Sequence, residues 1–149
     1  MITIQLEDLK EVLPELIDLL DSHYEELTLN KDRVRLNPVW SRYFAMVEEN
    51  KFFAIIARDE NKPIGYAGFI LDQHLHYADL IVAANDVLFI HPDYRKGMFG
   101  VKFLKFCEKT MKDLGAMKLT WHIKHSNDFR PILNRMKYED EDIISGKFL

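Results

Sequence analysis

The stretch NDVLFIHPDYRKGMFGVKFLKFCEKTMKDLG, residues 85–115, decides how this chain folds. Its apolar run over residues 87–90 is typical of a strand, and the basic segment over residues 95–100 that follows carries two glycines. Apolar residues then recur at helical spacing up to Gly115, a residue that commonly ends a helix. A strand, a glycine turn and a helix in this order aim backbone N–H groups and a helix N-terminus at phosphate. The stretch therefore predicts a phosphorylated cofactor.

The composition of the chain fits a single domain over residues 1–149. With 48% hydrophobic and 30% charged residues, the chain can bury a core and stay in solution. Its net charge of −4 counts against a dedicated nucleic-acid binder, which is usually basic. The single cysteine, Cys107, permits no internal disulfide and fits a reducing compartment. The N-terminus lacks a signal-peptide pattern and no apolar run is long enough to span a membrane, so we expect a cytoplasmic protein.

Hydrophobic periodicity predicts the elements of the first half. Residues 2–6 alternate like a short strand, and apolar residues then repeat at helical spacing, with Pro14 expected in the first turn of that helix. A loop or a broken helix is expected over residues 21–37. Asn37 and Pro38 form a good N-cap and first-turn pair for a second helix.

Strands and helices alternate in the second half. Strands are predicted over residues 52–58, 63–71, 87–90 and 119–124. Residues 72–85 are ambiguous, since residues 80–84 could extend a strand. Gly65 and Gly68 indicate a bulge or close packing. A short helix is expected over residues 128–136, and the tail through Leu149 is expected to add one or two strands. This order predicts an α/β fold, with a mixed, twisted sheet that is antiparallel in its first half and is flanked by about four helices.

The glycine turn matches neither the P-loop pattern nor G-x-G-x-x-G. Gly97 and Gly100 have the spacing of the GxxG loop of KH modules, but that loop joins two helices and here a strand comes first. The segment instead resembles motif A of the GNAT superfamily of N-acetyltransferases, in which a strand leads into R/Q-x-x-G-x-G/A and then a helix. Arg95 and Gly100 fill the first and last motif positions. Met98 replaces the central glycine, and Gly97 comes one residue earlier.

The resemblance covers most of the chain and is to the compact GNAT proteins of bacteria and their phages. It implies the GNAT acyl-CoA N-acyltransferase fold and acetyl-CoA as acetyl donor, with the N–H groups of residues 97–101 and the charges near Arg95 at the pyrophosphate. Pantetheine would pair with the backbone at Ile90, and the Leu88 N–H would stabilise the oxyanion. The cofactor-binding residues that the resemblance implies are Leu88, Phe89, Ile90, Arg95, Lys96, Gly97, Met98, Phe99, Gly100, Val101 and Asn127.

Asp86 stands where many family members carry a glutamate, on the same face of the predicted strand as Leu88. The resemblance implies that Asp86 is the base that takes the amine proton, directly or through a water. The alternative is a carboxylate that caps a strand or pairs with a neighbouring cation. The usual acid is missing, because Leu133 stands at the position of the family's tyrosine. Ser126, Asn127 or a water could substitute, or the thiolate could leave unassisted.

Two pairs of residues are candidates for acceptor binding. His23 and Glu26 fall in the region that borders the acceptor site of GNAT folds, where a carboxylate would favour a cationic amine. His74 and His76 would share one face of an extended segment and could line the acceptor pocket or relay protons. Solvated or core side chains are the simpler alternative for these residues, and Tyr43 is expected in the core. No characteristic ligand set points to a metal.

We therefore expect acetyl-CoA-dependent N-acetylation of a primary amine, of a small molecule or a protein, by direct attack in a ternary complex. The alternative is a non-catalytic CoA-binding or protein-interaction module, which Met98 and the missing tyrosine favour. Acylation of a nucleic-acid base or charged tRNA is a third possibility, disfavoured by the acidic balance although Lys118, Lys124 and Arg130 could form a basic patch. A homodimer is possible. Acceptor sites are built from variable loops, so the sequence does not identify the acceptor.

Overall fold

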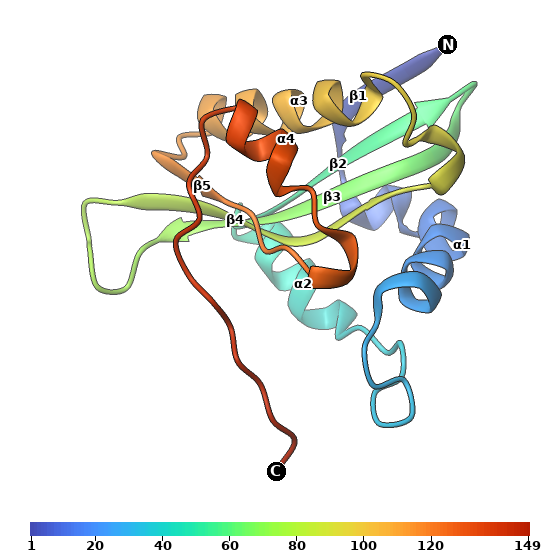
Figure 1. Cartoon of the computed structure of the whole chain (residues 1–149). Helices are drawn as coiled ribbons and strands as arrows, with labels where there is room; N and C mark the ends of the chain where they lie inside the picture. The colour runs from blue at the N-terminus through green and yellow to red at the C-terminus, as the bar shows by residue number, and fades with distance from the viewer.

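The computed structural model describes all 149 residues as one five-stranded sheet with helices on both faces. Figure 1 shows α1 and α2 on one side of the sheet and α3 and α4 on the other. The elements in chain order are β1 (Ile2–Glu7), α1 (Leu9–Leu27), α2 (Trp40–Glu48), β2 (Phe52–Asp59), β3 (Lys62–Gln73), β4 (Ile81–Ile90), α3 (Phe99–Asp113), β5 (Lys118–Thr120) and α4 (Arg130–Arg135), with short 3-10 helices η1 (Pro92–Tyr94) and η2 (His125–Asn127).

The sheet has the order β1-β2-β3-β4-β5. Its first four strands are antiparallel, and β5 is parallel to β4 because α3 carries the chain back between them. This arrangement confirms the mixed sheet with an antiparallel first half and the four flanking helices.

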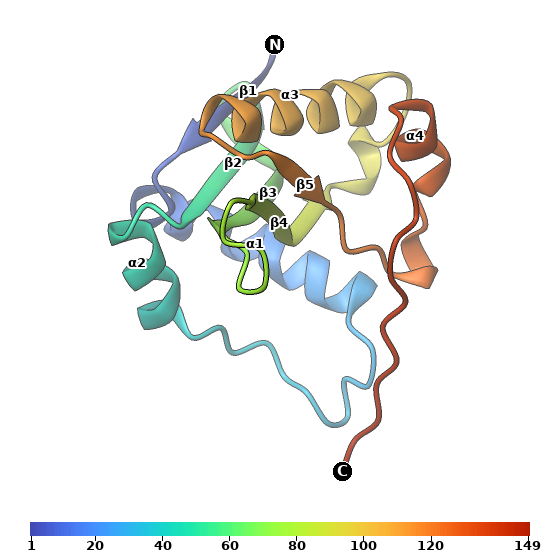
Figure 2. The same ribbon diagram turned by 90° about the vertical axis from the view of Figure 1, so that its left-hand side faces the viewer.

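Each face of the sheet has its own apolar layer. The turned view in Figure 2 shows the sheet between α3 on one side and α1 and α2 on the other. The apolar stripe of α1, with Val12 and Leu16 almost fully buried, covers Ile56 and Tyr66. The stripe of α3 covers the opposite face, and its residues Phe103, Cys107 and Met111 have no exposed surface. Cys107 is therefore a core residue, and burial raises the pKa of its thiol.

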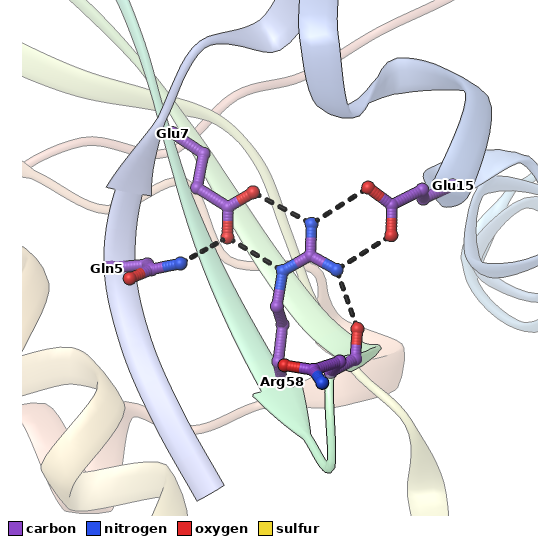
Figure 3. A network of polar contacts seen from close by, with 5 residues as sticks. Gln5, Glu7, Glu15 and Arg58 are labelled. Carbon is purple, nitrogen blue, oxygen red and sulfur yellow. Dashed lines mark hydrogen bonds and ion pairs between the residues drawn. The ribbon is translucent and has the colours of Figure 1, made fainter.

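Arg58 on β2 joins β1, α1 and a turn, as Figure 3 shows. Its Nε and Nη2 donate to the two carboxylate oxygens of Glu7, both at 2.8 Å, and its Nη1 and Nη2 donate to those of Glu15 at 2.7 and 3.1 Å. Nη1 also donates to the Asn61 carbonyl at 2.7 Å, and Gln5 donates to Glu7 at 3.1 Å. The Arg58 side chain is only 12% exposed, so this fixed fork of donors is saturated in a largely water-excluded place.

The helical half departs from the predictions at two points. Helix α1 starts at Leu9, so Pro14 lies in its second turn, and the helix continues through Leu27 instead of ending near residue 20. Burial of one long apolar stripe outweighs the loss of the hydrogen bond that proline cannot donate. Helix α2 starts at Trp40 with Val39 as N-cap and no side-chain cap, so the expected cap at Asn37 and Pro38 is wrong by two residues.

The tail departs further, because residues 136–149 contain no helix or strand and the predicted C-terminal strands are absent. Residues 139–142 are four consecutive carboxylates, whose mutual repulsion and hydration disfavour strand pairing. Single contacts tether the tail instead, such as the ion pair of Lys118 with Glu141 at 2.8 Å and Arg33 over the Phe148 ring at 5.0 Å. No helix of the protein is both long enough and apolar enough to cross a membrane.

Candidate functional site

The sheet splits between β4 and β5. The two strands pair only from Val82 with Lys118 to Ala84 with Thr120, and then diverge. Just past the last pair, the side chain of Asn85 replaces the strand partner, because its Oδ1 accepts the His122 N–H at 2.5 Å. The Asn85 residue is buried, at 4% exposed. From Asp86 onward, the edge of β4 that faces β5 is free of strand pairing.

The backbone of β4 turns two N–H groups toward this split. The His91 N–H donates to the Ile64 carbonyl at 2.8 Å on the β3 side. Because backbone groups of successive strand residues point to alternate sides, Leu88 and Ile90 face away from β3. The Ile90 carbonyl also points away from β3, since it accepts a hydrogen bond from Arg95 Nε at 2.7 Å.

A β-bulge in β4 presents Asp86. Gly68 pairs with Val87 and Phe69 with Asn85, so Asp86 is an extra residue with no partner on β3. A Cβ on Gly68 would lie 2.6 Å from Phe52 Cζ and 2.9 Å from Val87 Cγ2, so only glycine fits beside the bulge. This confirms the close packing that the glycines of β3 predict. The bulge expected within residues 63–71 lies at Ile64, which has no partner on β2 between the pairs Ala57 with Gly65 and Arg58 with Pro63.

Tyr43 on α2 reaches this bulge and donates its hydroxyl proton to Asp86 Oδ2 at 2.5 Å. Its ring packs edge-on against Phe52, with 5.1 Å between ring centroids. Burial and the hydrogen bond to Asp86 raise the pKa of Tyr43, so the phenol stays protonated across the physiological range. The expectation that Tyr43 is a core residue holds for its ring, which packs against the α1 layer of the core. Its hydroxyl has a partner that was not expected, a carboxylate 43 residues away in the sequence.

In the turn before α3, Gly97 lies one residue before the central glycine position of the family motif. Gly97 has φ +68°, a left-handed conformation that favours glycine, whereas Met98 has φ −93° and is the N-cap of α3. The glycine thus stands where the backbone requires it, and the Met98 side chain is 63% exposed. The N–H groups of residues 96–101 donate to no backbone acceptor and to no side chain. Nothing lies within 4 Å of the position that a Cβ on Gly100 would take.

Arg95 and Glu26, predicted for two different ligands, pair with each other. Arg95 Nη2 lies 2.6 Å from Glu26 Oε2, and the guanidinium sits over the Phe89 ring at 5.3 Å. With its Nε on the Ile90 carbonyl, Arg95 is folded back over β4, at the place where pantetheine was expected. Lys96 is exposed and has no ion pair.

His23 belongs to an aromatic group at the end of α1. Its Nδ1 lies 2.6 Å from the Tyr66 hydroxyl, and its ring stacks on Phe89 at 5.0 Å between centroids. Burial, followed by the charge of Lys124, lowers the pKa of His23 to about 4, so the imidazole is neutral at pH 7.

A cleft of about 1490 Å³ connects several of these groups. Its lining includes His23, Tyr43, Asp86, Leu88 and Asn127. Leu133, at the position of the expected tyrosine, is buried and also lines it. Residues 139–144 of the tail form another part of its wall.

Other predicted residues lie apart from this cleft. His74 and His76 belong to the hairpin loop between β3 and β4, where the His76 N–H donates to His74 Nδ1 at 3.1 Å. Figure 1 shows that this hairpin protrudes from the sheet. The structure thus does not bring these histidines to Asp86, and their part in acceptor binding stays a prediction. Glu26 and the turn at residues 95–101 also lie outside the lining.

Comparison with protein families gives one match: the model described as the acetyltransferase (GNAT) family matches residues 13–130. A search of curated proteins finds no match.

Solved structures resemble the chain over nearly its whole length. An aminoglycoside acetyltransferase from an uncultured soil metagenomic sample is 16% identical, with a TM-score of 0.74 over 99% of this chain and 96% of the other. A predicted acetyltransferase with acetyl-CoA from Clostridium acetobutylicum is 15% identical, with a TM-score of 0.69 over 99% and 96%. A transcriptional regulator from Bacillus halodurans is 15% identical, with a TM-score of 0.76 over 99% and 100%. At these identities the likeness shows the fold alone.

Proposed function

Because this chain belongs to the GNAT family of acetyltransferases, we propose that it transfers the acetyl group of acetyl-CoA to a primary amine by direct attack in a ternary complex. The carrying observation is the turn at residues 96–101, whose six consecutive N–H groups have no protein acceptor. N–H groups that converge at a helix N-terminus bind phosphate oxygens, and the partial positive charge of the helix end adds to the attraction. This turn leads into α3 beside the free edge of β4.

In this proposal, residues 96–101 hold the pyrophosphate and the Lys96 ammonium adds positive charge. The open space above Gly100 lets phosphate approach the backbone. The pantetheine arm lies along β4 from Leu88 to Ile90, where the missing strand partner leaves backbone groups free. For this, Arg95 must release the Ile90 carbonyl. Asn127, which lines the cleft in η2, contacts the arm from the other side.

Asp86 and Leu88 carry the chemistry in this proposal. The Leu88 N–H faces the split and would stabilise the negative charge that develops on the thioester oxygen. Asp86 Oδ2 accepts from Tyr43, which leaves Oδ1 to take the proton of the attacking amine. The cleft, which both residues line, has room for an amine acceptor.

Thermal unfolding with acetyl-CoA, CoA and dephospho-CoA tests the cofactor assignment. A ligand at 100 times its dissociation constant should stabilise the protein by about 2.7 kcal/mol. We expect a clear shift with acetyl-CoA and CoA. No shift with any of the three compounds would contradict the proposal.

Turnover tests the reaction. Free thiol release from acetyl-CoA is measured with a panel of primary amines that includes an aminoglycoside and a peptide with N-terminal alanine, because solved structures with this fold include an aminoglycoside acetyltransferase and a ribosomal-protein-alanine N-acetyltransferase. Asp86→Asn should lower kcat/KM by a factor of roughly 10² to 10⁴, the range of general base catalysis. Acetyl-CoA binding without turnover of any amine would indicate a CoA-binding module instead.

A further inference from the structure

The proposed reaction lacks a proton donor for the departing thiolate, because Leu133 occupies the position of the expected tyrosine and is buried. Protonating a thiolate needs a hydroxyl, thiol, imidazolium or ammonium group, or a water, within hydrogen-bond reach. Lys124, the ammonium that lines the cleft beside His23, donates to the Leu27 carbonyl at 2.8 Å. The buried Cys107 lies in the α3 layer of the core, and the pKa of His23 near 4 leaves its imidazole neutral at pH 7. Ser126 and Asn127 lie in exposed η2, and neither side chain has a hydrogen bond that ties it to Asp86.

The hydroxyls of the other five tyrosines do not meet Asp86, although Tyr24, Tyr66 and Tyr138 also line the cleft. Their hydroxyls meet the Val34 carbonyl, His23, Asp59 or Glu108, or point into solvent from the β3–β4 hairpin; in chain order these residues are Tyr24, Tyr66, Tyr77, Tyr94 and Tyr138. Tyr43 is the exception, because its hydroxyl meets the carboxylate of the bulge inside the cleft.

The position of Tyr43 is fixed by a chain of contacts. The missing side chain of Gly68 makes room for the Phe52 ring, and Tyr43 packs edge-on against that ring. The Trp40 ring, one turn earlier on α2, packs on the Tyr43 ring with 5.5 Å between centroids. The bulge then aims Asp86 at the Tyr43 hydroxyl, and Leu88 with its split-facing N–H follows two residues later.

We propose that Tyr43 is the general acid of the reaction and that it works with Asp86 as one proton-carrying pair. This inference rests on the proposed function. The amine nitrogen bonds to the thioester carbon, the C–S bond breaks, and sulfur leaves with the electron pair. One amine proton goes to the Asp86 carboxylate, and the Tyr43 hydroxyl gives its proton to sulfur. The proton on the Asp86 carboxyl then passes to the Tyr43 oxygen across their 2.5 Å contact, which restores both groups.

The pair also explains why a protein without the family's tyrosine on α4 can keep an acid. The hydroxyl reaches the cleft from α2. Helix α2 lies on the other side of the sheet from α3 and α4 (Figure 2). The Tyr43 hydroxyl alone would protonate sulfur only slowly. Asp86 provides it with a proton source, since Asp86 carries the proton that the amine has just lost.

The test compares two acetyl donors with Tyr43→Phe. With acetyl-CoA and an amine that the wild type acetylates, the variant should lose about 100-fold or more in kcat, as expected for loss of general acid catalysis. With para-nitrothiophenyl acetate, whose thiolate leaves without a proton, the same variant should stay within about fivefold of the wild type. Tyr94→Phe, which removes a comparable hydrogen bond to Asp59 outside the cleft, is the matched control and should behave as the wild type with both donors.

Two further measurements make each outcome decisive. The thermal shift with CoA shows whether Tyr43→Phe still folds and binds. A second variant, Asp86→Asn, and the double variant show whether the two residues act as a unit, in which case the double variant is little slower than either single one. Equal losses of Tyr43→Phe with both donors, or no loss with acetyl-CoA, would overturn the inference while leaving the proposed function intact. Absence of wild-type turnover with every amine would overturn both.

Discussion

Arg58 and the turn at residues 96–101 use N–H groups in opposite ways. Every N–H of the Arg58 fork donates to a protein oxygen, and the side chain is largely buried. The six N–H groups of the turn donate to none and lie in an exposed segment. The polar groups of the first region hold β1, α1 and β2 together, whereas the N–H groups of the second are available to water or to the proposed phosphate. The contrast teaches that saturated donors fix the fold, whereas free donors at a helix start are the groups that an anionic ligand can use.

Arg58→Ala should have the largest effect on stability, about 3 kcal/mol, because it leaves the carboxylates of Glu7 and Glu15 without their cation. Urea unfolding measures the loss. Lys109→Ala, which removes an exposed ion pair with Asp113, is the matched control and should change stability by less than about 0.5 kcal/mol. Equal losses of stability in the two variants would show that the hydrogen bonds of Arg58 stabilise the fold no more than an exposed ion pair does.

The pH dependence of unfolding sharpens this prediction. Hydrogen bonds from Arg58 lower the pKa of Glu7 below the usual glutamate value. Their stabilisation is therefore fully present above that usual value and is lost as pH falls through the lowered pKa of the folded state. Arg58→Ala should accordingly lose less stability on acidification than the wild type. An unchanged acid dependence would contradict the assignment.

Asn85→Ala tests the contact that holds the chain after β5 to β4 where the two strands diverge. It should cost about 2 kcal/mol, since it removes the hydrogen bond from the His122 N–H and leaves a cavity at the buried Asn85 side chain. Amide exchange of residues 118–124 should accelerate most. Asn134→Ala on the exposed face of α4 serves as control and should leave exchange unchanged. If Asn85→Ala also leaves amide exchange unchanged, the Asn85 side chain does not fix the chain after β5 to β4.

Gly100→Glu should weaken acetyl-CoA binding about tenfold, or about 1.4 kcal/mol, because it sets a carboxylate among the free N–H groups. Stability should not fall, since an acidic residue in the first turn favours the helix. Isothermal titration compares it with Gly100→Gln, which has the same size without the charge. Equal binding by the two variants would mean that these N–H groups meet no phosphate charge.

Glu26→Gln should have the smallest effect, a two- to threefold tighter binding of acetyl-CoA at low salt. The substitution frees Arg95 to add charge near the turn, but the half-exposed pair contributes less than about 1 kcal/mol. The gain should disappear at high salt because the interaction is screened. Weaker binding in the variant would indicate that Glu26 positions Arg95 for the cofactor.

Local patterns in the sequence were enough for much of the fold and for part of the site. The strand over residues 87–90, the glycine turn and the stripe of α3 each follow from neighbouring residues, and Gly68 indicated the close packing that the structure shows there. The predictions failed where local preference met a competing force, as at Pro14 within the packed α1 and at the acidic tail. The partner of Asp86 was missed because no short-range signal links it to α2.

The sequence by itself determined the order of elements up to α4 and the glycine turn before α3, because periodicity and turn chemistry act over a few residues. The expectation that Asp86 and Leu88 share one face of the strand is wrong, because the bulge turns Asp86 toward α2 whereas Leu88 packs in the α3 layer. Only the tertiary structure decided which side chains meet. Tyr43 reaches Asp86 across 43 residues, Arg58 reaches Glu7 across 51, and Arg95 reaches Glu26 across 69. Such contacts depend on how the helices pack on the two faces of the sheet, and this packing balances burial and charge over the whole chain.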